Sequence, residues 1–358
     1  MATNKETRAS IRAKARARRE FILEQARQAG EVSDGTIAEA GARNGVNWGV
    51  SAQSLKDDAE YFRSSRLPIV RPHRQHKFLY VTEAHFPYEI RKGVHAQGKE
   101  AIGQLAADLI RGASQLQGGV KYTQKDIFTL LAQHEHKASH STTAQSLTRK
   151  LKALYGKYDR LCALDSGTTT LSVAEVFGKT GREMLPDPFS SLKALTVVTN
   201  STDIARSLGH PKSSIQVIML GGRLRKETQA FAGSLAKTCL ESWNLHLDIS
   251  MVGTVGLEVR KQFLDSPNEK ELVAFMSDTF EEAETKQALF ARSTLRVILM
   301  DSSKFLSDAE IPINVGHFAF ARAAGVDVDI IITDNKQNAE KEIDDCWNNG
   351  VAVLVAAK

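Results

Sequence analysis

The segment Leu161-Cys162-Ala163-Leu164-Asp165-Ser166-Gly167-Thr168-Thr169-Thr170 gives the strongest indication of the fold. Its first four residues are apolar and predict a short buried strand, which ends in the Asp-Ser-Gly turn. The threonines lead into a predicted helix with Val173, Ala174 and Phe177 at its apolar positions. A turn of this composition presents backbone amides and hydroxyl groups at the positive end of a helix dipole, where a phosphate group binds readily. Glycine and threonine are also ordinary turn and cap residues, so the loop alone leaves both functions open.

The alternation of short apolar runs with helical patterns continues to the end of the chain. The predicted strands are 161–164, 195–198, 215–220, 249–252, 296–300, 329–332 and 351–355. Such alternation is typical of βαβ units, because each parallel strand needs a crossover helix. We therefore predict an α/β fold with a largely parallel, doubly wound sheet covered by helices.

Small and polar residues follow several of these strands, as Thr199-Asn200-Ser201, Gly221-Gly222, Gly253-Thr254 and Asp301-Ser302-Ser303-Lys304. Ligands of open α/β sheets bind outside the carboxyl ends of the strands, so these turns predict one anion site. Lys304 and Lys286 are candidate cations for that site, although each taken alone is equally well explained as a solvated lysine. The residues predicted to bind the ligand are Asp165, Ser166, Gly167, Thr168, Thr169, Thr170, Asn200, Gly221, Gly222, Lys286, Ser302 and Lys304.

The front of the chain is mostly helical. Helical spacing is found over 8–27 and over 34–43, and Ser51 is a candidate N-cap for a third, amphipathic helix. Residues 67–81 mix basic and apolar side chains and predict a short hairpin or wing. The result is a helix, a turn and an amphipathic helix, followed by a basic hairpin.

Charge is distributed unevenly along the 358 residues, whose formal net charge is +5. Residues 1–100 contain 18 Lys+Arg and 12 Asp+Glu, residues 101–160 contain 9 and 4, and the remaining 198 residues contain 20 and 26. A basic front favours contact with a polyanion such as nucleic acid, while the acidic back serves another role. A merely solvated basic surface would give the same counts.

Composition excludes several other classes of protein. With 42% hydrophobic and 25% charged residues, the chain is an ordinary globular protein, and no apolar run approaches the roughly 20 residues of a membrane span. Cys162, Cys239 and Cys346 form no CxxC pair, which fits a reducing, cytoplasmic compartment. The neighbouring histidines His134, His136 and His140 have no partnering cysteine or carboxylate cluster. Neither a metal site nor a cofactor is predicted.

Six motifs occur together in a fixed order: Leu164-Asp165-Ser166-Gly167-Thr168-Thr169-Thr170, Val197-Val198-Thr199-Asn200-Ser201, Leu220-Gly221-Gly222, Glu282-Ala283-Glu284-Thr285-Lys286, Asp301-Ser302-Ser303-Lys304-Phe305 and Ile332-Thr333-Asp334. In this order, and at close to this spacing, they resemble the DeoR family of bacterial transcription regulators. The pattern Lys99, Ile102, Ala106-Ala107, Leu109-Ile110, Gly112 resembles the helix that precedes the first sensor strand of that family. The resemblance covers about two-thirds of the chain.

The resemblance implies a sensor domain related to sugar-phosphate isomerases, with a winged helix-turn-helix in front. It implies a domain at 1–82, a linker at 83–98 and a sensor at 99–358 that contains a helical insertion at about 113–158. The expected partners are a double-stranded DNA operator, a phosphorylated sugar or similar anionic metabolite, and further copies of the chain in a homo-oligomer, without a membrane or an enzymatic activity. The residues expected to contact DNA are Ser51, Gln53, Ser54, Lys56, Arg63, Arg71 and Arg74.

Several positions depart from the pattern of the family. Asp57 stands where a second basic residue is usual in the reader helix, and an acidic group there repels phosphate. No glycine pair follows the 71–74 segment of the wing, and Ile249 replaces a usual lysine. The insertion carries Arg149, Lys150 and Lys152 beside the apolar stripe Ala144, Leu147, Leu151 and Leu154, which would suit an accessory DNA contact, a protein interface or a surface elaboration packed on the sheet.

Two alternatives remain beside the regulator. In a sugar-phosphate isomerase, one of Asp165, Asp301 and Glu282 would act as the base, and Lys304 or Lys286 would stabilise an enediolate. An isomerase has no need of the amino-terminal module, which favours the regulator. The second alternative is an interaction protein that has lost its operator. Loss of the operator would explain Asp57 and the altered wing, but it would not explain why the phosphate loop is retained.

Overall fold

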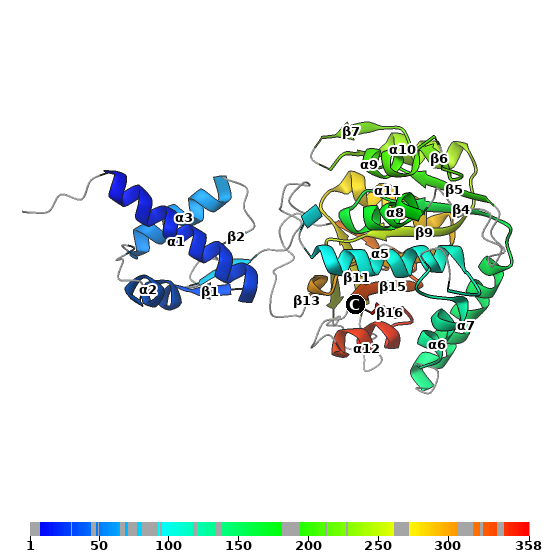
Figure 1. Ribbon diagram of the computed structural model, residues 1–358, viewed down its shortest axis with the longest axis horizontal. Coiled ribbons are helices and arrows are strands. Elements are labelled where there is room, and N and C mark those ends of the chain that lie inside the picture. Colours follow the sequence, from blue (N-terminus) through cyan, green and yellow to red (C-terminus); the bar gives the residue numbers. More distant parts are fainter. Residues whose placement is uncertain are drawn as a thin grey trace, which may run out of the picture. The chain divides into compact units, whose positions relative to one another are not determined.

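The computed structural model describes residues 8–29, 31–43, 48, 50–64, 69–70, 77–80, 92–93, 95–116, 120–133, 138–180, 194–211, 213–226, 228–260, 272–306, 318–322, 325–334 and 340–357 (Figure 1). The chain divides into two compact units, residues 1–91 and 92–358. This division falls inside the predicted linker, and the domain limits expected from the sequence stay a prediction. Arg71 and Arg74 lie outside the described residues, as does the side chain of Arg63.

The first unit consists of helices with a small antiparallel sheet. Its elements are α1 (Arg8–Ala29), β1 (Glu31–Ser33), α2 (Asp34–Arg43), α3 (Ala52–Ser64), β2 (Ile69–Val70) and β3 (Lys77–Tyr80). The strands pair in the order β1-β3-β2, so β2 and β3 form the predicted hairpin. Ile22, Ile37, Leu55 and Phe78 come from different elements and pack into one apolar core. This arrangement, in which α2 and α3 are followed by a wing, is that of a winged helix.

The second unit is built on a parallel sheet. Its described strands are β4 (Asp159–Leu164), β5 (Ala194–Thr199), β6 (Gln216–Met219), β9 (Leu247–Gly253), β12 (Ser293–Leu299), β15 (Ile330–Asp334) and β16 (Ala352–Ala356). Seven strands of the described residues are joined in the order β16-β15-β12-β9-β4-β5-β6, and every neighbouring pair is parallel. The predicted strands therefore coincide with strands of this sheet, and the predicted fold class is confirmed.

Helices cover both faces of the main sheet. They are α5 (Ala96–Arg111), α8 (Thr168–Thr180), α9 (Thr202–Leu208), α10 (Ser234–Ser242), α11 (Phe280–Ala291) and α12 (Glu340–Asn348). The crossover from β4 to β5 and the crossover from β9 to β12 run in opposite directions along the sheet. Because such crossovers are right-handed, α8 and α11 lie on opposite faces. The helix α5 packs beside α8 and crosses the strands near β15 (Figure 1).

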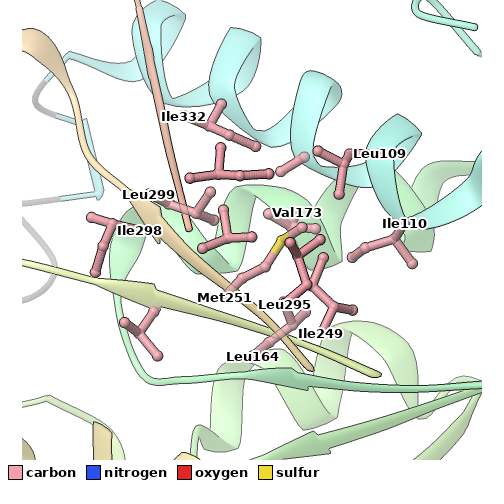
Figure 2. Close-up of a cluster of buried hydrophobic side chains, with 14 of the residues drawn as sticks. Leu109, Ile110, Leu164, Val173, Ile249, Met251, Leu295, Ile298, Leu299 and Ile332 are labelled. Carbon is pink, nitrogen blue, oxygen red and sulfur yellow. The ribbon is translucent and has the colours of Figure 1, made fainter. Parts of the chain in front are cut away.

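The core lies between α5, α8 and the strands. Figure 2 shows Leu109 and Ile110 of α5 close to Val173 of α8 and above the side chains of the central strands. Ile249 and Leu295, which come from β9 and β12, are at most 1% exposed. Each fully buried side chain of this size contributes roughly 1.5–3 kcal/mol of transfer free energy, so this layer fixes α5 on the sheet.

The insertion forms two helices, α6 (Gln124–Ala132) and α7 (Ala138–Tyr155). The apolar stripe of α7 is buried and joins the main core; it consists of Ala144, Leu147, Leu151 and Leu154. Arg149 and Lys152 are exposed, whereas Lys150 lies 2.6 Å from a carboxylate oxygen of Asp329. The insertion is thus packed on the sheet domain through its predicted stripe, and the partner of its exposed basic side chains stays undetermined.

Short strands outside the main sheet complete the unit. A second sheet has the order β13-β10-β11-β14, with β10 (Gly256–Arg260), β11 (Leu272–Ser277), β13 (Phe305–Leu306) and β14 (Phe318–Ala321). A separate hairpin consists of β7 (Arg223–Arg225) and β8 (Ala230–Ala232). These pieces follow the carboxyl ends of β6, β9 and β12, and they were not predicted from the sequence.

Candidate functional site

The loop after β4 surrounds a buried carboxylate. Asp165 is 1% exposed, and its Oδ1 accepts a hydrogen bond from the backbone amide of Gly253, after β9, at 2.9 Å. The Nζ of Lys286, which projects from α11, lies 3.0 Å from Oδ2 of the same carboxylate and donates to the carbonyl of Gly253. Burial raises the pKa of Asp165, although Lys286 and the Gly253 amide favour the charged form. Loops from two strands and one helix therefore meet at this ion pair.

Asn200 connects the phosphate-like loop to its neighbour. Its side-chain oxygen accepts from the Ser166 amide at 2.9 Å, and its side-chain nitrogen donates to the Phe231 carbonyl at 2.8 Å. Thr170 closes the turn, because its hydroxyl donates to the carbonyls of Asp165 and Gly167. The loop therefore has a fixed shape, with the first amides of α8 at its end, as an anion site requires.

Ser166, Gly167 and Thr168 are half-buried, so they remain within reach of a small molecule, whereas Thr169 and Thr170 are buried in the start of α8. Gly221 is exposed at the end of β6, and Gly222 has a φ of 150° and lies against Phe231 and Ala232 of β8. The predicted loop residues after β4, β5 and β6 thus occupy neighbouring positions along the sheet edge.

A second group of predicted residues lies at the end of β12. The short 3-10 helix Ser302–Lys304 is capped by Asp301, which accepts from the Ser303 amide at 3.1 Å. Lys304 lies 3.5 Å from the same carboxylate. Burial alone would raise the pKa of Asp301, but Lys304, the Ser303 hydroxyl and the charges of His95 and Lys99 together hold it below the ordinary value. Asp301 is therefore a permanently charged anchor at neutral pH.

Two residues that the sequence did not single out as ligand-site residues, Asp334 and Arg225, also hold these loops. Asp334, at the end of β15, accepts from the Ser302 amide at 2.6 Å. Arg225 of β7 pairs with Glu282 and donates to the Thr279 hydroxyl at 3.0 Å. Asp334 ends one of the six motifs and could have been noticed there, but nothing in the sequence indicates that Arg225 reaches α11.

The predicted ligand residues thus form two groups at one edge of the sheet. Asp165, Ser166, Asn200 and Lys286 are joined by direct contacts, while Ser302 and Lys304 are held through Asp301 and Asp334. A cavity of about 660 Å³ lies elsewhere, at the far end of α11, where Arg292, His246 and Lys237 contribute to its lining. None of the predicted ligand residues lines it.

The candidate DNA-binding helix is α3. Gln53 and Lys56 are exposed, and the Gln53 side chain donates to Asp57 at 2.8 Å. Ser51 and Ser54 cap the helix reciprocally, because each side-chain hydroxyl accepts from the backbone amide of the other. Their direct contact with DNA stays a prediction, since both hydroxyls are already used within the cap.

A buried ion pair that the sequence did not reveal fixes α3 in the first unit. Asp58 is 0% exposed and pairs with both Arg18 and Arg19 of α1. The Arg18 guanidinium also donates to the backbone carbonyls of Trp48 and Ser54. The N-terminal arginines that gave the front its basic composition are therefore partly structural.

The sequence of the second unit between residues 156 and 335 matches the family model described as the DeoR C-terminal sensor domain. The chain belongs to this family. The matched segment begins directly after α7 and ends directly after β15, so the insertion, α12 and β16 lie outside it.

Curated relatives of this DeoR-family chain are regulators by name. The HTH-type transcriptional regulator GlpR of Haloferax volcanii is 27% identical over 191 residues, which is 53% of this chain and 60% of the relative. An uncharacterized HTH-type transcriptional regulator, YulB of Bacillus subtilis, is 29% identical over 51% of this chain and 57% of its own length. The lactose phosphotransferase system repressor of Streptococcus mutans is 28% identical over 48% of this chain and 57% of its own length. The matches with these relatives span about three-fifths of their lengths.

Among solved structures, ribose 5-phosphate isomerase from Plasmodium falciparum is similar to 46% of this chain and 54% of its own, with 16% identity and a TM-score of 0.26. Ribose 5-phosphate isomerase A from Methanocaldococcus jannaschii is similar to 45% of this chain and 53% of its own, with 13% identity and a TM-score of 0.26.

Other predicted features of this DeoR-family chain can now be placed. Ile249, which replaces the lysine usual in the family, is 0% exposed in the core of β9 and does not belong to the loops. His140 stacks on Trp347 with ring centroids 5.4 Å apart, while His134 and His136 lie outside the described residues. In the part of the chain that the structure describes, no group of metal-ligating side chains is found, and no helix is long and apolar enough to cross a membrane.

Proposed function

We propose that this chain is a cytoplasmic DNA-binding transcription regulator whose sensor domain binds a phosphorylated sugar or a related anionic metabolite. The observation that carries the proposal is the presence, in one chain, of a winged-helix unit and a DeoR sensor domain. The names of the curated relatives support it, since these proteins are called transcriptional regulators or repressors. A homo-oligomer on a double-stranded operator is part of the proposal.

In this proposal α3 is the helix that enters the major groove. Gln53 and Lys56 are its exposed polar side chains, and an amide and an ammonium group suit base edges and phosphates. Asp57 holds the Gln53 side chain by a hydrogen bond, so the acidic residue that departs from the family pattern positions a neighbour rather than facing a phosphate alone. Each lysine that neutralises a phosphate adds a salt-dependent term to the affinity.

The effector in this proposal binds at the loops after β4, β5 and β12. The half-buried Ser166–Thr168 turn offers amides at the start of α8 for a phosphate group. The half-buried Ser166 and Thr168 side chains of this turn suit the hydroxyl groups of a sugar, while the Asp165–Lys286 and Asp301–Lys304 ion pairs and Asn200 hold the loops in place. An apolar molecule offers no partner for the hydroxyls and amides of this turn, which disfavours it as a ligand.

An isomerase is disfavoured by the state of its candidate bases. Both oxygens of Asp165 are engaged, one by the Gly253 amide and one by Lys286. Glu282 pairs with Arg225, and Asp301 pairs with Lys304. A general base needs a lone pair directed at the substrate, and each of these carboxylates instead serves a structural ion pair. We therefore propose a binding function without catalysis.

Electrophoretic mobility shift with the DNA upstream of the protein's own gene tests the proposal. The full chain should bind with an affinity that falls at least tenfold between 50 and 200 mM salt, because several phosphates are neutralised. Lys56→Ala should weaken binding, whereas Lys341→Ala, which removes an exposed lysine from α12, is the matched control. Equal effects of the two variants, or binding that is independent of salt and sequence, would contradict the proposal.

A further inference from the structure

The start of the second unit is tied to the candidate site by an ion pair. The Nζ of Lys92 lies 2.8 Å from a carboxylate oxygen of Asp203, and the two side chains are 33% and 9% exposed. Asp203 belongs to the first turn of α9, whose N-cap is Ser201. The residue before that cap is Asn200, which accepts from the Ser166 amide in the phosphate-like loop. Lys92 therefore holds a turn that is hydrogen-bonded to the candidate site.

A second tie lies in the first turn of α5. The backbone at Gly98 is so close to Asp334 that a Cβ atom there would overlap the carboxylate. The other oxygen of Asp334 accepts from the Ser302 amide at 2.6 Å. One aspartate thus contacts α5 on one side and the loop after β12 on the other.

The charges of the same turn act on that loop as well. Lys99 is 2% exposed, and together with His95 it favours the ionised form of Asp301, the residue that caps Ser302–Lys304. The two ties and this charge effect come from one short stretch of the chain, and they reach loops at the ends of β5, β12 and β15. The stretch is also the part of the second unit that is nearest in sequence to the DNA-binding unit.

We propose that Lys92, His95, Gly98 and Lys99 form a latch, whose closure on Asp203 and Asp334 depends on whether the effector loops are occupied. The proposal rests on the proposed function, because the latch leads to the unit that we assign to DNA. A ligand that takes the Ser166 or Ser302 amide changes the hydrogen bonding of Asn200 or Asp334, and so changes the energy of the contacts that hold the latch. Because coupling between two sites is reciprocal, opening the latch must also change the affinity of the loops for the ligand.

The first experiment needs no ligand and compares two cations that share one carboxylate. Arg206 of α9 lies 3.0 Å from the other oxygen of Asp203, but it belongs to the sensor itself. Amide hydrogen exchange of the full-length Lys92→Met variant should be about fivefold faster at 92–99, at 166–171 and at 200–204, which is the order expected for the loss of one partly buried ion pair. The Arg206→Met variant should leave 92–99 unchanged.

A glycine pair tests the second tie in the same way. A Cβ atom added at Gly98 meets Asp334, whereas one added at Gly93 has no atom within 4 Å. Gly98→Ala should speed exchange at the Ser302–Lys304 amides, and Gly93→Ala should not. The latch would be overturned if Lys92→Met and Gly98→Ala changed exchange only at 92–99, because the contacts would then hold the chain without reaching the site. It would also be overturned if Lys92→Met and Arg206→Met, or Gly98→Ala and Gly93→Ala, had equal effects.

A final arm links the latch to ligand. Ribose 5-phosphate, glucose 6-phosphate and inorganic phosphate are each added to the wild-type protein, and exchange at 92–99 is measured again. A probe that protects 166–171 should change exchange at 92–99 at least twofold, and protection of 166–171 alone would overturn the proposal. If no probe protects 166–171, the effector assignment is in question, while the ligand-free variants still decide the latch.

Discussion

The two ends of α5 are held in different ways. At its carboxyl end, the fully buried Arg160 guanidinium donates to the carbonyls of Ile110 and Arg111 of α5 and of Leu154 and Tyr155 of α7. At its amino end, the preceding residue is His95, an exposed residue with a φ of 51° and no side-chain cap, and the contacts are those of the latch.

One end of the helix is therefore bound to the insertion, and the other end contacts the loops of the candidate site. Many buried hydrogen bonds hold the carboxyl end, so moving it is expensive, whereas a few polar contacts hold the amino end. The helix is therefore fixed at the end next to the insertion and more weakly held at the end that is nearer in sequence to the first unit. It also gives the insertion a physical role, as the anchor of the fixed end.

The largest expected effect is at the carboxyl end of α5. Arg160→Met removes a cation from four helix-terminal carbonyls, of which that of Leu154 keeps a backbone donor, the Lys157 amide. We therefore expect a loss of about 4 kcal/mol in the free energy of unfolding. Chemical denaturation of the full chain measures it. Arg149→Met, on the exposed face of α7, is the control and should change stability by less than about 0.5 kcal/mol. Equal losses would show that the Arg160 hydrogen bonds contribute nothing specific.

A smaller effect is expected one turn earlier in α5. Asp108 is 0% exposed and accepts hydrogen bonds from the backbone amides of Lys121 and Tyr122, which lie in the insertion just before α6, and from the Arg111 side chain. Asp108→Asn removes one acceptor and leaves Arg111 without its carboxylate, so thermal unfolding should show a loss of about 2 kcal/mol. The exposed Asp159→Asn serves as the control. A loss below about 0.5 kcal/mol would mean that the insertion is held by its apolar stripe alone.

At the amino end the expected effect depends on pH. The pKa of Asp301 is lowered in the folded state, so this residue contributes stability above its unfolded pKa of about 3.9, and that contribution disappears as the pH falls through the folded pKa. Asp301→Asn should therefore cost about 1 kcal/mol at pH 7 and progressively less below about pH 4. Denaturation of both proteins from pH 3 to pH 7 measures the difference. A cost that is constant over this range would contradict the assigned charge.

The smallest expected effect is a gain in stability. A left-handed conformation is unfavourable for a residue with a Cβ atom, so His95→Gly should stabilise the folded chain by about 0.5 kcal/mol, less whatever the imidazole contributes at Asp301. Thermal unfolding measures the difference. A clear loss of stability would show that His95 is held by contacts stronger than its backbone strain.

Periodicity in the sequence predicted the parallel sheet and most of its helices, because strands such as 161–164 are nearly all apolar and the helices between them have clear apolar stripes. It missed the second sheet, where a strand such as Gly256–Arg260 is short and contains charged residues. It also missed the ion pairs of Asp58 and Arg225, since the partners of each lie tens of residues away and nothing local links them.

The sequence likewise predicted part of the candidate site and missed part of it. The turns after β4, β5 and β12 were identified because glycine, serine, threonine and asparagine gather at strand ends. The contact between Asp165 and Lys286 was not, because it depends on the packing of α11 against the sheet edge. The resemblance to the DeoR family supplied the order of the motifs, and the fold explains why they meet.

The most direct test of the account is the fluorescence anisotropy of labelled upstream DNA, titrated with the full-length protein in the presence of sugar phosphates and of the same sugars without phosphate. The account predicts that at least one phosphorylated sugar shifts the dissociation constant fivefold or more, while its unphosphorylated counterpart has no effect. DNA binding that responds equally to both forms, or a chain that binds a sugar phosphate without any change in its affinity for DNA, would contradict it.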